Sequence, residues 1–177
     1  MELTTSTEHV PIQAGDVIVF QGDHFVSRVI AYASDWPRCK ISHCAIMADI
    51  DNNLAEATTL DGENGVAIVG LQYKLDTYEG HMWHLPLRAE ARKRLQLDKL
   101  ATFVWSEVSH PYSKLQAVLA PLRVGQDLHN WADDWYCSKL VAKALVEGSV
   151  LSVMFDVAIT PSQLTRLNCF GPMRQLK

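Results

Sequence analysis

The chain has 177 residues, of which 48% are hydrophobic and 20% are charged. This length and composition predict one globular domain with a sizeable core, and they exclude a long disordered chain or a fibrous repeat. With 16 Lys and Arg against 20 Asp and Glu, the net charge is −4. Duplex nucleic acid is therefore excluded as an expected partner, because its phosphates would require an excess of positive charge.

Hydropathy and the N-terminal sequence bear on localisation. No apolar run approaches the roughly 18 residues needed to cross a bilayer, so we expect no integral membrane segment. The first 27 residues contain no Lys or Arg, and Glu2 and Glu8 stand where a secretory signal would be basic. These features predict a cytoplasmic protein without a signal peptide, and they leave export by a signal-independent route open.

The first half of the chain has strand patterns. Residues 1–14 are polar and irregular and predict a flexible arm, followed by a single domain over 15–177 that begins at the turn around Gly15. A short apolar run over 17–20 predicts a buried strand. Helical spacing is found over 24–34. The further predicted strands are 41–50, 54–58, 66–71 and 81–87, with a turn at 51–53.

Helical composition dominates the second half. Residues 89–109 are helical in composition, and the best-defined helix is 135–147, with Asp133 or Asp134 available as its cap and Gly148 able to end it. Strands first and helices second favour an α+β domain, with an antiparallel sheet packed against helices.

Cys137 is the first candidate for chemistry. The other three cysteines are Cys39, Cys44 and Cys169, and four at irregular spacing are too few for a disulfide scaffold. Cys137 lies in the predicted first turn of the helix, on the apolar stripe shared by Leu140, Val141, Ala144 and Leu145. A helix start favours thiolate over thiol, and its free N–H groups can hold an oxyanion. The alternative is a small buried hydrophobe.

His43 is the best-placed base for such a thiol. It interrupts the start of an apolar strand, in the run ISHCAIM over 41–47, where an imidazole needs a polar partner. The alternative is a core or strand-edge histidine. The other histidines lack this context and are expected at the surface or at interfaces: His9, His24, His81, His84, His110 and His129.

Together these motifs resemble a known family. In chain order they are GDVIVF (15–20), SHCAI (42–46), AEA (55–57), GV (65–66), PY (111–112), WYCSKLV (135–141) and TPSQL (160–164). The pattern resembles the permuted papain-like cysteine hydrolases of the NlpC and YiiX/YaeF type. Ordinary NlpC-type enzymes place the Cys-Ser helix before the His strand, whereas here the order is reversed, as in the circularly permuted branch.

The resemblance implies a role for each matching residue. Cys137 corresponds to the nucleophile, His43 to the general base, and Glu56 to the polar residue that orients the imidazole. Tyr112 corresponds to a tyrosine near the nucleophile, and it is expected to line the substrate site with two residues adjoining the catalytic pair, Ser42 and Tyr136. At Cys44 and Ala45 the sequence departs from the family, which more often has a small aliphatic residue and Gly.

Strand pairing from the sequence argues against Glu56. A turn centred on Asn52 places Glu56 opposite Ala48, five residues from His43, or about 17 Å along a flat strand. Only strong twist or a bulge would then join them. Asp49, Asp61 and Glu63 are the alternatives for the orienting residue.

No cofactor or metal is expected. Cys39, His43 and Cys44 have a ligand-like spacing, but no closely spaced pair elsewhere completes a tetrahedral site. The chain is thus expected to be a cysteine amidase or endopeptidase that acts on a small peptide, such as a cell-wall stem peptide or a lysine-containing fragment. The alternatives are a thiol acyltransferase or lipid hydrolase resembling the lecithin retinol acyltransferase family, and a non-catalytic binding module. The sequence leaves the oligomeric state open.

Overall fold

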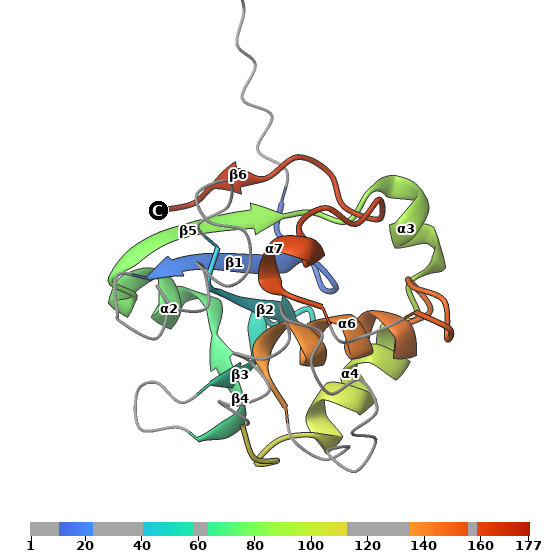
Figure 1. The fold of residues 1–177 in the computed structure, drawn as a ribbon, viewed down its shortest axis with the longest axis horizontal. Helices are drawn as coiled ribbons and strands as arrows, with labels where there is room; N and C mark the ends of the chain where they lie inside the picture. The colour runs from blue at the N-terminus through green and yellow to red at the C-terminus, as the bar shows by residue number, and fades with distance from the viewer. Residues whose placement is uncertain (1–10, 23–40, 59–63, 113–134, 156–158) are drawn as a thin grey trace, which may run out of the picture.

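A six-stranded antiparallel sheet forms the centre of the protein (Figure 1). The computed structural model describes residues 11–22, 41–58, 64–112, 135–155 and 159–177. The strand order is β4-β3-β2-β1-β5-β6. The strands are β1 Val17–Gly22, β2 His43–Met47, β3 Asn53–Thr58, β4 Gly65–Gly70, β5 Gly80–Leu85 and β6 Arg174–Gln175. The α+β class and the antiparallel sheet predicted from the sequence are confirmed.

The strand boundaries differ from the predicted ones near the first hairpin. The predicted strand 41–50 is shorter, because the Asp49 carboxylate accepts hydrogen bonds from the backbone N–H groups of Asp51 and Asn53 and from the Asn53 amide. Asp49 therefore belongs to the loop, which Asn52 closes in the left-handed region at φ 62°. The two-residue strand β6 has too little sequence pattern to be predicted.

The helices of the described chain are α2 Leu71–Thr77, α3 Ala89–Arg94, α4 Leu97–Ser106, α6 Cys137–Glu147 and α7 Pro161–Leu164. The predicted helical segment 89–109 is broken at Leu95 and Gln96, where the Gln96 N–H bonds the Gly148 carbonyl instead of continuing the helix. Helix α2 was not predicted, since Leu71 was assigned to the preceding strand. The predicted helix 24–34 lies outside the described residues.

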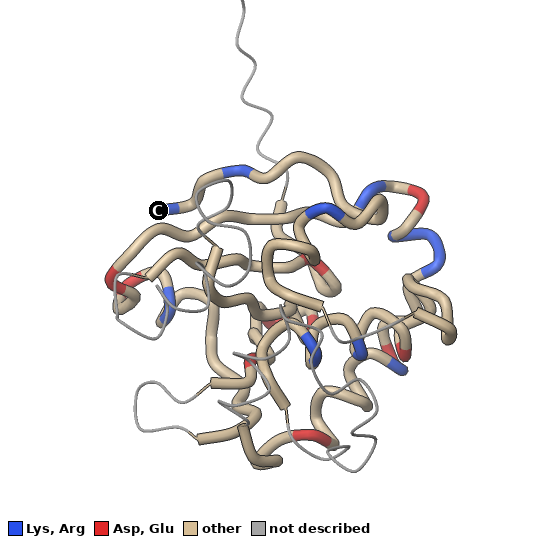
Figure 2. The backbone as a smooth tube through the Cα atoms, viewed as in Figure 1, with Lys and Arg blue, Asp and Glu red and all other residues tan. Residues whose placement is uncertain are grey.

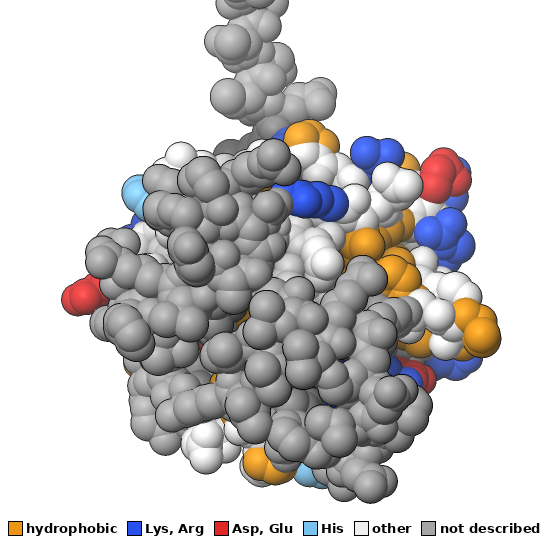
Figure 3. Space-filling model, viewed as in Figure 1, with side chains coloured by type: hydrophobic (Ala, Val, Ile, Leu, Met, Phe, Trp, Pro, Cys, Tyr) orange, Lys and Arg blue, Asp and Glu red, His pale blue; other side chains and the backbone are white. Residues whose placement is uncertain are grey.

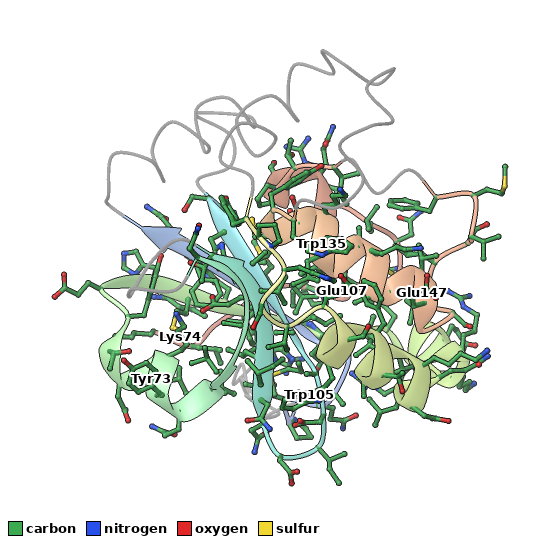
Figure 4. All side chains as sticks on the ribbon, turned by 90° about the horizontal axis from the view of Figure 1, so that it is seen from below. Tyr73, Lys74, Trp105, Glu107, Trp135 and Glu147 are labelled. Atoms are coloured by element: carbon green, nitrogen blue, oxygen red, sulfur yellow. The ribbon has the colours of Figure 1, made fainter. Side chains whose placement is uncertain are left out.

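The sheet separates two layers of core. Val17, Val19, Cys44 and Ile46 point to one face and pack with α4 and α6, whereas Ile18, Phe20, Ala45 and Met47 point to the other. Leu71 of α2 packs on this second face. Figure 4 shows α2 on the opposite side of the strands from α4 and α6. Alternation along the strands, with a period of two, therefore feeds both layers.

The surface carries both signs of charge (Figure 2). Basic side chains gather at α3, whose last turn holds Arg92, Lys93 and Arg94. Apolar side chains are visible on the same face (Figure 3), and the exposed large ones come from several segments: Ile50, Tyr73, Trp105, Val153, Met154 and Met173. Among the described residues, no helix is both long enough and apolar enough to cross a membrane.

The N-terminal region joins the fold shortly before Gly15. Ile12 packs against the second core layer, and Ala14 is buried. Gly15 has φ +84°, and its N–H bonds the Met47 carbonyl at 2.8 Å, so a left-handed residue starts the turn into β1. Residues 1–10 lie outside the described part of the chain.

Candidate active site

Cys137 is the first residue of α6. The helix begins two residues later than predicted, because Trp135 stays extended: its N–H bonds the Pro111 carbonyl at 3.0 Å, and it forms a parallel bridge with Tyr112. Tyr136 is the N-cap residue and contributes no side-chain capping bond. The predicted caps Asp133 and Asp134 lie outside the described residues. Cys137 is thereby placed where the helix N–H groups lack intrahelical acceptors.

The start of α6 is anchored from several directions. The Trp135 indole N–H donates to Glu107 Oε2 at 2.8 Å, just after the end of α4, and Figure 4 shows the two side chains together. The Ser138 hydroxyl donates to the Ile159 carbonyl at 2.6 Å. The predicted apolar stripe is buried along its whole length, with Leu140, Val141, Ala144 and Leu145 inaccessible to solvent. This packing fixes Cys137 against β2.

His43 is the first residue of β2, and it is partly exposed while the rest of the strand is buried. It pairs with Phe20 of β1, and the two rings are 5.2 Å apart. The His43 side chain is 15% exposed, so it is more accessible to solvent than Glu56 and Cys137, which are both 2% exposed. A polar ring at the mouth of a buried strand must have partners, and His43 has them on both sides.

Glu56 of β3 lies beside His43. The His43 Nε2 donates to Glu56 Oε2 at 2.8 Å. The expected register was wrong: Ile46 pairs with Ala55, so Glu56 is level with Ala45 rather than Ala48. It is thus only two residues from His43 along the ladder, roughly 7 Å, and needs no bulge. The physical reason is the Asp49 loop, which shifts the turn toward β2.

The charges of this pair stabilise each other. Burial opposes ionisation of both groups, but attraction and hydrogen bonding to His43, together with a nearby Lys74, hold the pKa of Glu56 down at about 2. Burial would likewise lower the pKa of His43, yet the Cys137 thiolate and Glu56 outweigh it and raise that pKa to about 9. The imidazole is therefore protonated at neutral pH when Cys137 is a thiolate.

Cys137 is ionised by its neighbours. Its pKa is held well below the usual thiol value, first by a hydrogen bond from the Cys44 thiol and then, against the cost of burial, by the charge of His43 and a hydrogen bond from it. Cys44 shows the opposite effect: burial and the adjacent thiolate raise its pKa well above the usual value. One sulfur thus favours the thiolate form, and the other is its hydrogen-bond donor. Since Glu56 occupies Nε2, the Nδ1 atom of His43 is the nitrogen left for Cys137.

Two residues of this group were missed from the sequence. From the sequence, Cys44 is considered only as a departure from the family and as a possible metal ligand, although its position directly after His43 is the available signal. Lys74 was not singled out at all. Its Nζ lies 2.7 Å from Glu56 Oε1, and both side chains are buried. A lysine at the i+3 position from the buried Leu71, on a helix following a strand, is a weak signal that only the fold makes clear.

The three predicted substrate-site residues have different surroundings. Tyr112 is half-buried, and burial together with the nearby Cys137 and Cys44 raises the pKa of its hydroxyl, so it lies beside Cys137. Tyr136 is buried directly before Cys137. The Ser42 hydroxyl is also buried; it accepts from the Gly22 N–H and donates to the Phe20 carbonyl, both at 3.4 Å, which fastens β2 to β1.

Among the other candidates, Asp49 is engaged in the hairpin loop, and Asp61 and Glu63 lie outside the described residues. His84 corrects the prediction of a surface histidine. It is buried and donates from Nε2 to Asp16 Oδ2 at 2.8 Å, because the fold brings together two residues that are 68 positions apart. His110 and His81 are exposed, as expected.

The described part of the chain holds no group of three or more His, Cys, Asp or Glu side chains suited to a metal ion. Cys39, which completes the ligand-like spacing with His43 and Cys44, lies outside that part. Cys169 is buried in the same core layer as Cys137, and burial raises the pKa of its thiol to about 11. It is thereby a ready internal reference for the reactivity of Cys137.

Comparisons with known proteins show the fold and little more. No known family model matches the chain, and no curated protein sequence matches it. A similar solved structure is that of the metalloprotein yiiX from Escherichia coli O157:H7 (DUF1105), with a TM-score of 0.58 and 14% sequence identity. The match covers 93% of this chain and 96% of that one. The chain therefore has the fold of a YiiX-type protein over nearly its whole length.

Proposed function

We propose that this protein is a cysteine amidase or endopeptidase of circularly permuted papain-like fold, which hydrolyses an amide bond in a small peptide. The observation that carries the proposal is the buried series of Cys137, His43 and Glu56, in which a thiolate, an imidazolium and a carboxylate stabilise one another. The YiiX-type fold supports it, because the His strand precedes the Cys helix in the permuted order.

Each step of the chemistry has a residue in place. The Cys137 thiolate attacks the carbonyl carbon, and N–H groups at the start of α6 can donate to the oxyanion that forms. The His43 imidazolium then gives its Nδ1 proton to the leaving amine, which departs and leaves an acyl-enzyme. Neutral His43 next takes a proton from water, whose oxygen attacks the thioester and releases the acid. Glu56 holds the ring in one orientation throughout and stabilises its positive charge.

The substrate class follows from the family resemblance: a cell-wall stem peptide or a lysine-containing fragment. The neutral-pH ion pair serves attack on an amide, whose amine leaving group needs the proton that imidazolium supplies.

The test is to trap the acyl-enzyme. The full chain is incubated with a panel of peptidyl amides and, separately, with fatty-acyl esters, and intact mass and peptide mapping identify the acylated residue. We expect a peptidyl adduct on Cys137, turnover of peptidyl amides, and loss of both in Cys137→Ala but not in Cys169→Ala. Acylation by lipid esters alone would replace the proposal with the acyltransferase alternative. Absence of any adduct would favour a binding module.

A further inference from the structure

Glu56 is held from two sides. One carboxylate oxygen, Oε2, accepts from His43, and the other, Oε1, accepts from Lys74 Nζ at 2.7 Å. Lys74 and Glu56 are 6% and 2% exposed at their side chains, so this is a buried ion pair rather than a surface contact. Buried lysine is rare unless it is paired. A surface ion pair would contribute little, whereas loss of one member of a buried pair leaves an uncompensated charge.

Lys74 reaches the site from the far side of the sheet. It lies on α2, which follows β4 directly and packs its Leu71 on the face opposite α6 (Figure 4). The end of α2 is fixed separately, since Lys177 Nζ donates to the carbonyls of Leu75 and Tyr78 at 2.9 and 2.8 Å. Lys74 is thus not needed merely to dock the helix.

Among the residues that the structure describes at this site, the charges of Cys137, His43 and Glu56 sum to zero only when Lys74 is counted. The Cys137 thiolate and the Glu56 carboxylate carry two negative charges, and the His43 imidazolium carries one positive charge. Lys74 supplies the second positive charge within hydrogen-bonding distance of Glu56. A net negative charge in a buried site is costly, and a site without Lys74 would relieve that cost by taking up a proton.

We propose that Lys74 is a positioning residue of the active site, which clamps Glu56 by its second oxygen and balances the buried charge so that Cys137 stays a thiolate. This inference rests on the proposed function, because it assigns Lys74 to the same site. Lys74 acts through Glu56 and His43 and does not itself touch the reacting atoms.

The test measures alkylation of Cys137 by iodoacetamide against pH, by peptide mapping, which requires no substrate. In the described chain, the titratable groups that act on Cys137 include His43 and Cys44 of β2 and Tyr112, and Glu56 of β3 and Lys74 of α2 act on His43 and on each other. In Lys74→Met the acid-side midpoint should move to higher pH by about half a unit or more, a roughly threefold slower reaction below the midpoint, because the positive charge that favours thiolate is gone. Lys74→Arg should restore the midpoint, because it keeps the charge.

The matched control is Lys177→Met, which removes the anchor of α2 without touching Glu56. It should leave the midpoint unchanged. In a Glu56→Gln background, Lys74→Met should shift the midpoint by less than it does in the unsubstituted protein, because the clamp on the Glu56 carboxylate is already gone and only the lost charge still acts. Should Lys74→Met fail to fold, Lys74→Gln keeps a donor for Glu56 without the charge and is expected to shift the midpoint in the same direction.

Three results would overturn the inference: a Lys74→Met profile that coincides with the unsubstituted one, an equal shift in Lys177→Met, or a full additional shift in the Glu56→Gln background. Failure of the proposed function gives a different result, in the acylation test: no peptidyl adduct forms on Cys137 there, whether or not Lys74→Met shifts the alkylation midpoint.

Discussion

Two buried histidine–carboxylate pairs lie in this sheet, and they differ in what faces the ring. In one, His43 Nε2 donates to Glu56 at 2.8 Å and Lys74 binds the other oxygen. In the second, His84 Nε2 donates to Asp16 at 2.8 Å and Arg92 binds the other oxygen. The local chemistry is the same: a ring, a carboxylate and a cation. Of these two histidines, only His43 forms a hydrogen bond with Cys137.

The second pair connects chain segments. Besides His84, the Asp16 carboxylate accepts from the backbone N–H groups of Gln13 and Leu87, so it joins the start of β1 to the segment after β5. His84 itself is almost fully buried. In the first pair, by contrast, His43 is the first residue of β2 and lies next to Cys137 at the start of α6. A histidine that is hydrogen-bonded to a carboxylate therefore becomes a candidate base only where its other ring nitrogen faces a thiol.

The largest expected effect separates the two histidines. His43→Ala should lower turnover of the peptidyl amide by a factor on the order of 10² to 10⁴, because proton transfer is lost. His84→Ala should leave turnover per folded molecule unchanged but destabilise the fold by about 3 kcal/mol, since Asp16 loses a buried partner. Steady-state kinetics and denaturant unfolding measure the two outcomes. Equal losses of turnover in both variants would remove the distinction drawn between the pairs.

The carboxylates give the next largest effect. Glu56→Gln keeps size and polarity but removes the charge, so turnover should fall tenfold or more, about 1.4 kcal/mol. The pKa of His43, raised to about 9 by its neighbours, should fall, and the alkaline limb of the activity profile should move to lower pH. The measurement is the pH dependence of turnover.

Its counterpart in the second pair is Asp16→Asn. This variant should unfold at lower denaturant while its pH profile stays in place, because Asp16 holds backbone rather than substrate. An alkaline limb that does not move in Glu56→Gln would make Glu56 a structural residue of β3.

Cys44 gives the smallest effect and sharpens the comparison further. Cys44→Ala removes the thiol that donates to Cys137, so the acid-side midpoint of Cys137 alkylation should rise, with the rate at pH 6 falling by about threefold. Cys44→Ser keeps a hydrogen-bond donor, so its midpoint should lie between those of the unsubstituted protein and Cys44→Ala. The check is iodoacetamide labelling of Cys137 over a pH series. A lower midpoint in Cys44→Ala would show that the neighbouring thiol opposes ionisation.

Local sequence patterns pointed to Cys137 and His43 but not to Glu56. The apolar stripe over Cys137 and Leu140 marks one helix face, and a polar residue at the start of an apolar strand marks His43. Glu56 came only from the family resemblance, because the hairpin register depends on how the Asp49 side chain binds the loop. The turn residues in the sequence do not predict that Glu56 lies level with Ala45 rather than Ala48.

Contacts between distant segments were not predictable in this way. His84 seemed a surface residue because Asp16, its partner, is 68 positions earlier. Lys74 is not singled out by the sequence, since a seven-residue helix after a strand gives too short a pattern to assign. Both residues are buried by tertiary structure. The fold decides their partners, which are Asp16 for His84 and Glu56 for Lys74.

The most direct test of the central claim is the rate of iodoacetamide alkylation of Cys137 between pH 5 and 10, measured beside Cys169 in the same molecule and repeated in His43→Ala. We predict rapid labelling of Cys137 at neutral pH, slow labelling of Cys169, whose pKa is raised to about 11, and a marked loss of Cys137 reactivity without His43. Labelling of Cys137 that rises only at alkaline pH, at the same rate with and without His43, would contradict the account.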